Sequence, residues 1–323
     1  MKNILITGVA GMIGSTLLEK LLKKKDLNII GLDNFTLGKK EYIKQFLKYK
    51  NFKFFNVDVS KKFKNFELIK FLKKRKLSEI WLLAANSDIA AGVKNSDVDF
   101  KNTYLTTYNV LNDSYKFIDK NTKILFASSS AIYGTVKKVI SENTAPLKPE
   151  SNYGSMKAAS ESFISSYSHK YNLKSFIFRF PNVVGTNLTH GVIYDLSRKI
   201  IANNNYLNVL GNGEQCKPYS DVNEIINCMI FLKEKKNNQL INFYNIGSTD
   251  KGVKVKKIVE LLIKKFNYNK KVKYQKQKFG WPGDILTYKY TTLKMKKVGF
   301  KFRLSSLEAI KKTIKAISKN NLK

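Results

Sequence analysis

Residues 4–14 read ILITGVAGMIG, an apolar run that passes through three glycines and continues as a helical pattern. Glycines at this spacing between a strand and a helix form a turn that cradles a diphosphate. Gly8 allows the tight turn, Gly11 lets the phosphates approach the backbone, and Gly14 lets the helix pack against the strand. The N–H groups that open the helix then face the anion. This stretch predicts a nucleotide site at the start of an α/β fold.

An acid follows the next apolar run. Asp33 comes directly after a predicted strand at 27–32, at the distance expected from the glycine motif. A carboxylate there accepts hydrogen bonds from both adenosine ribose hydroxyls and repels a 2′-phosphate, so the expected cofactor is NAD. Without the glycines, Asp33 would be read as a turn residue at the end of a strand.

The first half of the chain alternates short apolar runs with longer helical patterns. Strands are predicted at 3–7, 27–32, 52–57, 79–83, 123–127 and 175–179, and helices at 12–24, 40–49, 61–74, 97–119 and 151–171. This alternation predicts a doubly wound parallel sheet, a Rossmann fold, with helices on both faces. Ligands of such sheets bind beyond the carboxyl ends of the strands.

The pattern changes after about residue 180, where Gly, Asn and Pro clusters separate shorter segments. Helical patterns recur at 221–233, 255–266 and 305–317. We therefore expect residues 1–180 to form the NAD-binding domain, catalytic residues included. Residues 181–323 are expected to form mainly a smaller C-terminal α/β substrate lobe, with some segments returning to the sheet and a cleft between the two parts.

Composition limits the function classes. The 323 residues carry 59 Lys and Arg against 24 Asp and Glu, a formal net charge of +35. Because the lysines are scattered over helix faces, a solvated surface is favoured over a nucleic-acid face, although the field would attract anionic substrates. Two histidines and the cysteines Cys216 and Cys228 cannot supply a zinc site, so no metal is expected. No stretch is apolar and long enough to span a bilayer, and a cytoplasmic protein with reduced thiols is expected.

Two groups of residues can carry chemistry. Tyr153 and Lys157 are four residues apart, which places them on one face of the predicted helix 151–171. A lysine cation can lower the pKa of a tyrosine from about 10 and make it a base for a hydroxyl whose carbon gives up a hydride. Such a pair is also common by chance in a lysine-rich chain. The row of serines at 128–130 strengthens the functional reading, because it ends a predicted strand where a ligand must lie.

With these residues identified, the chain resembles the extended short-chain dehydrogenase/reductase family, and within it the NAD-dependent nucleotide-sugar epimerases and dehydratases of the UDP-glucose 4-epimerase type. The resemblance covers nearly the whole chain, including LAAN at 83–86, RFPNVVG at 179–185 and YNIG at 244–247. It implies the catalytic residues Ser129, Tyr153 and Lys157. It implies a cofactor site of Gly8, Gly11, Met12, Ile13, Gly14, Asp33, Asn34, Asp58, Val59, Leu83, Ala84, Ala85, Asn102, Tyr153, Lys157 and Pro181. It implies a substrate site of Ser87, Ser129, Ser130, Asn182, Lys217, Trp281 and Asp284.

The resemblance also narrows the reaction. Sugar-nucleotide 4,6-dehydratases follow their catalytic hydroxyl with an Asp-Glu pair, where this chain has Ser130 and Ala131. Dehydration is therefore disfavoured, and the serine row is similar to that of the 4-epimerases. The implied reaction is 4-epimerisation of a UDP-hexose through a transient 4-keto sugar. Tyr153 would take the O4 proton, Ser129 would hydrogen-bond O4, and Lys157 would tune Tyr153 and hold the nicotinamide ribose.

Some positions differ from the family pattern. Lys217 and Trp281 stand where many epimerases bind the diphosphate with arginines, and lysine cannot make the bidentate contact. The sugar and the nucleotide base therefore stay open. His190 is interpreted as a surface residue of the substrate loop.

Other activities stay open as well. They are a reductase, decarboxylase, dehydratase or epimerase at another carbon, or a non-catalytic NAD-binding protein with a basic surface for RNA or a partner. The last is disfavoured because a binding protein has no need of Ser129, Tyr153 and Lys157. The resemblance further implies a homodimer formed through helices 97–119 and 151–171.

Overall fold

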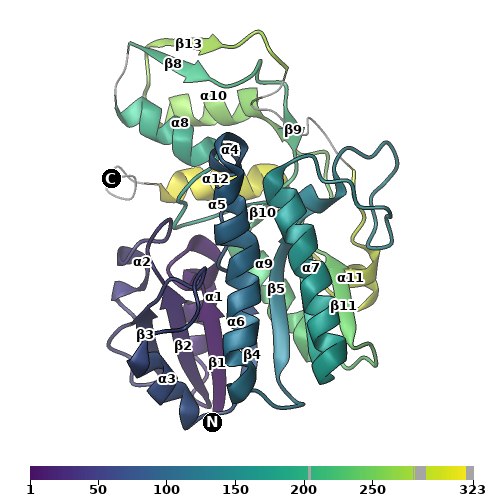
Figure 1. Ribbon diagram of the computed structural model, residues 1–323. Helices are drawn as coiled ribbons and strands as arrows, with labels where there is room; N and C mark the ends of the chain where they lie inside the picture. The colour runs from purple at the N-terminus through teal and green to yellow at the C-terminus, as the bar shows by residue number, and fades with distance from the viewer. Residues whose placement is uncertain (203–204, 279, 281–288, 318–323) are drawn as a thin grey trace.

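A seven-stranded parallel sheet organises the chain. The computed structural model describes residues 1–202, 205–278, 280 and 289–317 (Figure 1). The strand order is β11-β6-β5-β4-β1-β2-β3, and every neighbouring pair is parallel. The strands are β1 (Lys2–Thr7), β2 (Leu27–Asp33), β3 (Phe52–Asn56), β4 (Leu77–Leu82), β5 (Lys123–Ser129), β6 (Lys174–Phe180) and β11 (Ile241–Asn245). The predicted doubly wound sheet is confirmed, and the chain order reverses between β1 and β4.

Helices cover both faces of this sheet. One face packs against α1 (Met12–Leu22) and α9 (Val222–Glu234), and the other against α3 (Phe66–Lys73), α6 (Thr106–Ser114) and α7 (Asn152–Tyr171). Strand β1 shows why the strands read as continuous apolar runs. Its Ile4 and Ile6 belong to the first core and Leu5 to the second, so consecutive side chains are all buried.

Several predicted helices have different bounds. The pattern at 40–49 contains only α2 (Glu41–Lys44), and α3 begins at Phe66 because Asn65 caps it. The pattern at 97–119 is divided into α5 (Ser96–Asp99), a π-helical turn η1 (Phe100–Leu105), α6 and a 3-10 turn η2 (Tyr115–Phe117). In the wide turn, the Asn102 carbonyl oxygen accepts a hydrogen bond of 2.8 Å from the N–H of Asn86. A contact from another part of the chain thus accompanies the break in the helix.

Apart from α9 and β11, which belong to the sheet layer, much of the chain after β6 forms a smaller lobe beyond the carboxyl ends of the sheet strands (Figure 1). Its helices are α8 (Val192–Ile201), α10 (Val255–Phe266) and α12 (Ser306–Ala316). Three short strand pairs complete it, β7 (Asn182–Val184) with β10 (Tyr219–Asp221), β8 (Tyr206–Val209) with β13 (Lys271–Tyr274), and β9 (Cys216–Lys217) with β12 (Val253–Lys254). The remaining helices are α4 (Ile89–Lys94) after β4 and α11 (Leu293–Lys297). Helix α8 and these short strands were not predicted.

The described helices and the described His, Cys, Asp and Glu side chains limit the function classes. None of the helices that the structure describes is long and apolar enough to cross a membrane. Within the same residues, no group of three His, Cys, Asp or Glu side chains could hold a metal ion. Both cysteines are free, with Cys228 buried and Cys216 half-buried.

Candidate active site

A cleft of about 780 Å³ lies between the sheet and the smaller lobe. Its volume falls within the range typical of small-molecule sites. Every predicted site residue that the structure describes lines this cleft, whereas Trp281 and Asp284 lie outside the described residues. The lining predicted residues are Gly8, Gly11, Met12, Ile13, Gly14, Asp33, Asn34, Asp58, Val59, Leu83, Ala84, Ala85, Ser87, Asn102, Ser129, Ser130, Tyr153, Lys157, Pro181, Asn182 and Lys217.

The glycine turn forms one wall of the cleft. Gly8 has a φ of +69°, and a Cβ there would lie 2.8 Å from the backbone nitrogen of Ala84. A Cβ on Gly14 would lie 2.1 Å from the carbonyl oxygen of Gly8, so neither position tolerates a side chain. Helix α1 begins after Gly11 without a side-chain cap. Its first N–H groups are therefore available to a diphosphate in the cleft.

Asp33 lies at the end of β2, beside the glycine turn and at the position expected for the adenosine ribose of NAD. Its carboxylate accepts hydrogen bonds from the N–H of Ala10 at 2.9 Å and of Phe35 at 2.8 Å. Burial raises the pKa of Asp33, and these two hydrogen bonds oppose the rise. The uncapped helix, the crowded glycines and this acid together fit the adenosine diphosphate half of NAD.

The segment after β4 forms the floor beneath the cofactor position. Thr7 Oγ1, at the end of β1, accepts hydrogen bonds of 3.2 Å from the N–H groups of Leu83 and Ala84. The hydrogen bond from Asn86 to Asn102 joins the next residues to the π-helical turn. The floor is thus attached to a central strand on one side and to η1 on the other.

Ser129, Tyr153 and Lys157 meet inside the cleft. Ser129 is the last residue of β5, and its side chain acts on Tyr153 as a polar neighbour that lowers the pKa of the Tyr153 hydroxyl. Tyr153 lies in the first turn of α7, which the Ser151 side chain caps. Lys157 Nζ donates a hydrogen bond of 2.5 Å to the carbonyl oxygen of Ala127 and lies 5.7 Å from the centre of the Tyr153 ring. A base, a hydroxyl donor and a cation are therefore gathered at the carboxyl end of a central strand.

Burial controls the protonation of this group in the cofactor-free protein. Burial raises the pKa of Tyr153, and the Ser129 side chain opposes the rise. Burial also lowers the pKa of Lys157 to about 7. The expected lowering of the Tyr153 pKa is therefore not seen in this state, where burial is the largest influence and raises that pKa. A neutral Tyr–Lys pair and a phenolate–ammonium pair hold the same number of protons, so the two groups titrate as one unit.

The substrate side of the cleft includes a residue that the sequence reading misplaced. His190 is half-buried and lines the cleft, so its interpretation as a surface residue was wrong. Its Nδ1 lies 2.9 Å from Thr189 Oγ1 and 3.3 Å from Ser87 Oγ. Burial lowers the pKa of His190, which favours a neutral ring at neutral pH. The fold brings this loop against Ser87, about a hundred residues earlier in the chain.

Two acids on the same side of the cleft were also missed. Asp88 caps α4 by accepting a hydrogen bond of 3.2 Å from the N–H of Ala91, and it lines the cleft. Asp195 reaches the cleft from the first turn of α8. Burial raises the pKa of Asp195, and the negative charge of Asp88 adds to the rise. A helix-capping signal could have located Asp88, whereas Asp195 depends on a helix that was not predicted.

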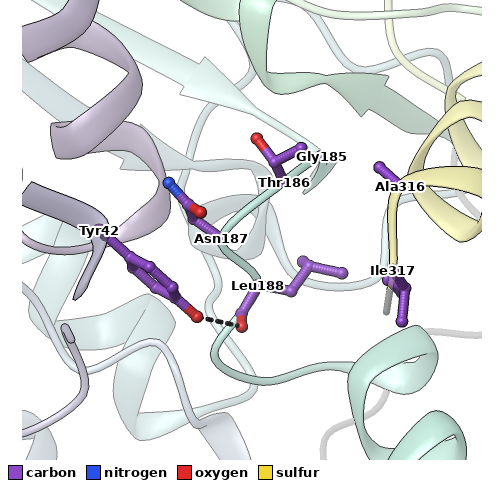
Figure 2. Close-up of a pocket in the computed structure, with 7 residues that line it drawn as sticks. All are labelled: Tyr42, Gly185, Thr186, Asn187, Leu188, Ala316 and Ile317. Carbon is purple, nitrogen blue, oxygen red and sulfur yellow. Dashed lines mark hydrogen bonds between the residues drawn. The ribbon is translucent and has the colours of Figure 1, made fainter. Parts of the chain in front are cut away.

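A second, small cavity of about 20 Å³ lies beside the substrate loop, between Tyr42, residues 185–188 and the end of α12 (Figure 2). It has room for about one water molecule and none for a substrate. The Tyr42 hydroxyl donates a hydrogen bond of 3.0 Å to the carbonyl oxygen of Leu188, as Figure 2 shows. Asn187 Nδ2 donates to Ser15 Oγ at 3.1 Å. These contacts hold the substrate loop against the first part of the chain.

Comparison with known proteins agrees with this geometry. The profile described as "NAD dependent epimerase/dehydratase family" matches residues 4–247. A protein of Methanocaldococcus jannaschii named putative UDP-glucose 4-epimerase is 27% identical over 326 residues, which cover 98% of this chain and 99% of that protein.

Solved structures agree as well. The UDP-glucose 4-epimerase of Thermotoga maritima, solved with UDP-glucose, has a TM-score of 0.81 and 26% identity and covers 97% of both chains. The UDP-glucuronic acid 4-epimerase of Bacillus cereus, solved with UDP-glucuronic acid and NAD, shares the fold, with a TM-score of 0.83, 23% identity and coverage of 97% and 98%.

Proposed function

Since this chain belongs to the NAD-dependent epimerase/dehydratase family, we propose that it interconverts the C4 epimers of a UDP-hexose. The observation that carries the proposal is that Ser129, Tyr153 and Lys157 line the same cleft, with Lys157 Nζ 5.7 Å from the centre of the Tyr153 ring. The family depends on NAD, and the glycine turn and Asp33 are the groups that fit it. When bound, NAD supplies a reversible acceptor for the hydride of the sugar C4 carbon.

In this proposal the residues of the chain move and hold one proton. Tyr153 takes the proton of the sugar O4 hydroxyl and returns it to the epimer, while Ser129 hydrogen-bonds O4. Lys157 keeps positive charge next to the developing phenolate. Ser130 and Ala131 follow Ser129, and neither can act as the acid or base that elimination of water requires. This absence favours epimerisation over dehydration.

Asp88 and Asp195, the two acids on the substrate side of the cleft, favour a sugar without a charge as the substrate. The named relatives include enzymes of UDP-glucose and of UDP-glucuronate, which differ by a carboxylate at C6 of the sugar. Asp88 and Asp195 line the cleft beside His190, which is favoured as neutral. A uronate carboxylate brought near these two acids would meet like charge in a partly desolvated site, which disfavours its binding. A neutral hexose has no such penalty.

A direct assay tests this proposal. Purified protein is mixed separately with UDP-glucose, UDP-galactose and UDP-glucuronate without added cofactor, and products are resolved by proton NMR. We expect UDP-glucose and UDP-galactose to reach the same equilibrium mixture from both sides, and UDP-glucuronate to react far more slowly. Faster conversion of UDP-glucuronate would contradict the role given to Asp88 and Asp195. A 4-keto-6-deoxy product would replace epimerisation by dehydration.

We also propose that the chain forms a homodimer through η1, α6 and α7. Phe100, Tyr108 and Tyr115 are exposed by 44%, 39% and 49% on this side. Tyr108 contacts Phe163 of α7 at 5.1 Å between ring centres, and Tyr115 contacts Tyr171 at 4.7 Å. This aromatic surface is of the kind that protein interfaces cover. Light scattering at micromolar concentration should give twice the monomer mass, and a monomer mass would contradict the proposal.

A further inference from the structure

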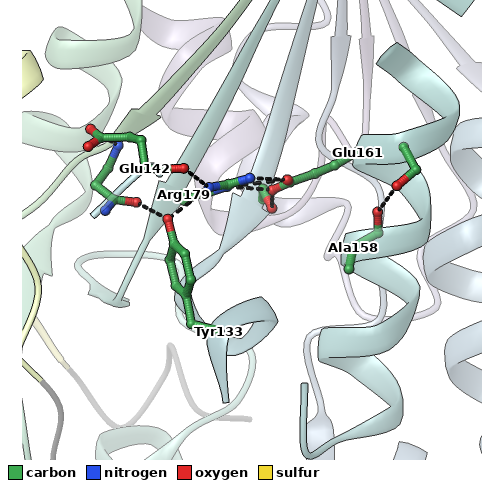
Figure 3. Close-up of polar contacts among 8 residues, drawn as sticks. Tyr133, Glu142, Ala158, Glu161 and Arg179 are labelled. Carbon is green, nitrogen blue, oxygen red and sulfur yellow. Dashed lines mark hydrogen bonds and ion pairs between the residues drawn. The ribbon is translucent and has the colours of Figure 1, made fainter. Parts of the chain in front are cut away.

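A buried ion pair joins Glu161 of α7, the helix that carries Tyr153 and Lys157, to Arg179 of β6 (Figure 3). Arg179 of β6 and Glu161 of α7 have side-chain exposures of 6% and 4%. The Arg179 Nε atom donates to Glu161 Oε1 at 3.0 Å, and Arg179 Nη2 donates to Glu161 Oε2 at 2.6 Å. The guanidinium therefore binds both carboxylate oxygens.

The ion pair is joined to the strand that carries Ser129. Ser128 Oγ donates a hydrogen bond to Glu161 Oε1, and Ser128 is the residue before Ser129 at the end of β5. Arg179 Nη1 donates to the Tyr133 hydroxyl at 2.9 Å, in the 3-10 turn that follows (Figure 3). The same carboxylate thus contacts β5 and, through Arg179, the turn after it. The Glu161–Arg179 pair therefore contacts the residue before Ser129 and the turn that follows it.

Glu161 also lies one helical turn after Lys157. Residues four apart on a helix are neighbours on one face, and both side chains are buried. Asp99 of α5 is the other charged group that acts on Lys157. The Tyr153 ring faces Lys157 from the same helix, α7. Asp99 Oδ1 accepts a hydrogen bond of 2.7 Å from Asn86 Nδ2.

Charged groups farther out on the helices near α7 have less effect. Lys94, Asp97 and Lys101 are all exposed, so solvent screens their charges. The two buried carboxylates, Glu161 and Asp99, are therefore the negative charges that Lys157 meets within the protein.

We propose that Glu161 is a positioning residue, whose carboxylate offsets part of the burial penalty on the Lys157 cation from one helical turn away and holds Ser129 in place through Ser128. The inference rests on the proposed function for its purpose, but it concerns groups of the chain itself. Burial lowers the pKa of Lys157, and the charge of Glu161 opposes that effect. Loss of the carboxylate would remove this opposition and leave Arg179 without its counter-ion. Both changes disfavour the lysine cation.

NMR titration of the Lys157 side chain tests the inference without requiring activity. The protein is labelled with ¹³C at lysine Cε, and the signal that titrates near neutral pH is assigned by its loss in Lys157→Met. In Glu161→Gln this midpoint should fall by about one pH unit or more. Turnover should fall mainly in kcat at neutral pH, since Lys157 and Ser129 act on the proton that is transferred, whereas the groups proposed to hold the nucleotide are unchanged.

A second buried ion pair provides the matched control. Lys233 Nζ lies 2.6 Å from Glu79 Oε1, with side-chain exposures of 8% and 9%, and Glu79 lies near the start of β4, away from the cleft. Glu79→Gln should reduce stability in a similar way but leave the Lys157 midpoint unchanged. If Glu161→Gln does not fold, the variant Glu161→Gln/Arg179→Met removes both charges, a replacement that buried ion pairs often tolerate. Its midpoint should also fall.

A Lys157 midpoint that is the same in wild type and in the Glu161 variants would overturn the inference. An equal shift in Glu79→Gln would also overturn it, since the effect would then be one of general destabilisation. Absence of epimerase turnover in the wild type would refute the proposed function alone, because the titration is read independently of turnover.

Discussion

Lys157→Met should stabilise the NAD-free protein near neutral pH while it removes activity. Lys157 is only 2% exposed, and burial lowers its pKa from 10.5 to about 7. Between these two values the unfolded chain holds a proton that the folded protein has released, so the free energy of unfolding rises with pH across this window. Below pH ~7 the folded state carries the whole penalty of the buried cation, roughly 5 kcal/mol, and at pH 7 it carries roughly 4 kcal/mol.

The replacement also loses an interaction. The Lys157 ammonium donates to the Ala127 carbonyl oxygen, and methionine leaves that acceptor without this donor, which costs about 1–3 kcal/mol. The net expectation is that the free energy of unfolding of Lys157→Met exceeds that of wild type by about 1–3 kcal/mol at pH 7. Near pH 10 the lysine is neutral when folded and largely charged when unfolded, so the advantage should be gone.

Urea unfolding followed by circular dichroism, on protein stripped of NAD, measures this difference at pH 7 and pH 10. Lys101→Met is the control, because Lys101 is exposed and forms only an exposed ion pair with Asp97. Its effect should be at most about 0.5 kcal/mol at both pH values. The reasoning is refuted if Lys157→Met is less stable than wild type at pH 7, or if its advantage does not shrink at pH 10.

Three further predictions concern the ligands. Tyr153→Phe should lower kcat by roughly a hundred- to ten-thousand-fold in steady-state kinetics. Its NAD content, measured by the absorbance of released cofactor, should be unchanged. A variant that keeps more than half the activity would exclude Tyr153 as the base. The wild-type protein should retain NAD through purification. In calorimetry, Asp33→Asn should bind NAD more weakly and NADP more tightly. A preference of the wild-type protein for NADP would contradict the role given to Asp33. The KM for the nucleotide sugar should rise with salt, since the screening length falls to about 3 Å at 1 M. Lys217→Ala should raise this KM and make it depend less on salt. A KM that is insensitive both to salt and to this substitution would mean that other groups bind the diphosphate.

The sheet could be predicted because most of its strands, unlike the edge strand β3, are buried on both faces. Such strands read as unbroken apolar runs, and the six predicted strands agree with β1 to β6 within about two residues at each end. Helix α8 was missed although Val192, Ile193, Leu196 and Ile200 have helical spacing, because the preceding Gly and Asn residues suggested a loop. No local sequence pattern predicts the π-helical turn η1. The carbonyl oxygen of Asn102 in this turn accepts a hydrogen bond from the N–H of Asn86, which lies in another segment of the chain.

The cofactor wall of the site could be predicted because each of its residues does a local task. Gly8 and Gly14 are required by the backbone itself, as their lack of space for a Cβ shows. The protonation of Lys157 could not be predicted, because Asp99 and the β5 backbone reach it only in the folded chain. The position of His190 could not be predicted for the same reason, since its loop meets Ser87 only through tertiary packing, and Asp195 was missed because α8 was not predicted.

The most direct test of the account follows the hydrogen at C4 of the sugar. UDP-glucose that carries deuterium at C4 is incubated with the purified enzyme in ordinary water without added cofactor, and the UDP-galactose is analysed by NMR and mass spectrometry. UDP-galactose should form with deuterium retained at C4, because the deuterium that leaves C4 returns to the same carbon within one closed site. Formation of UDP-galactose with hydrogen at C4, or no formation of UDP-galactose, would contradict it.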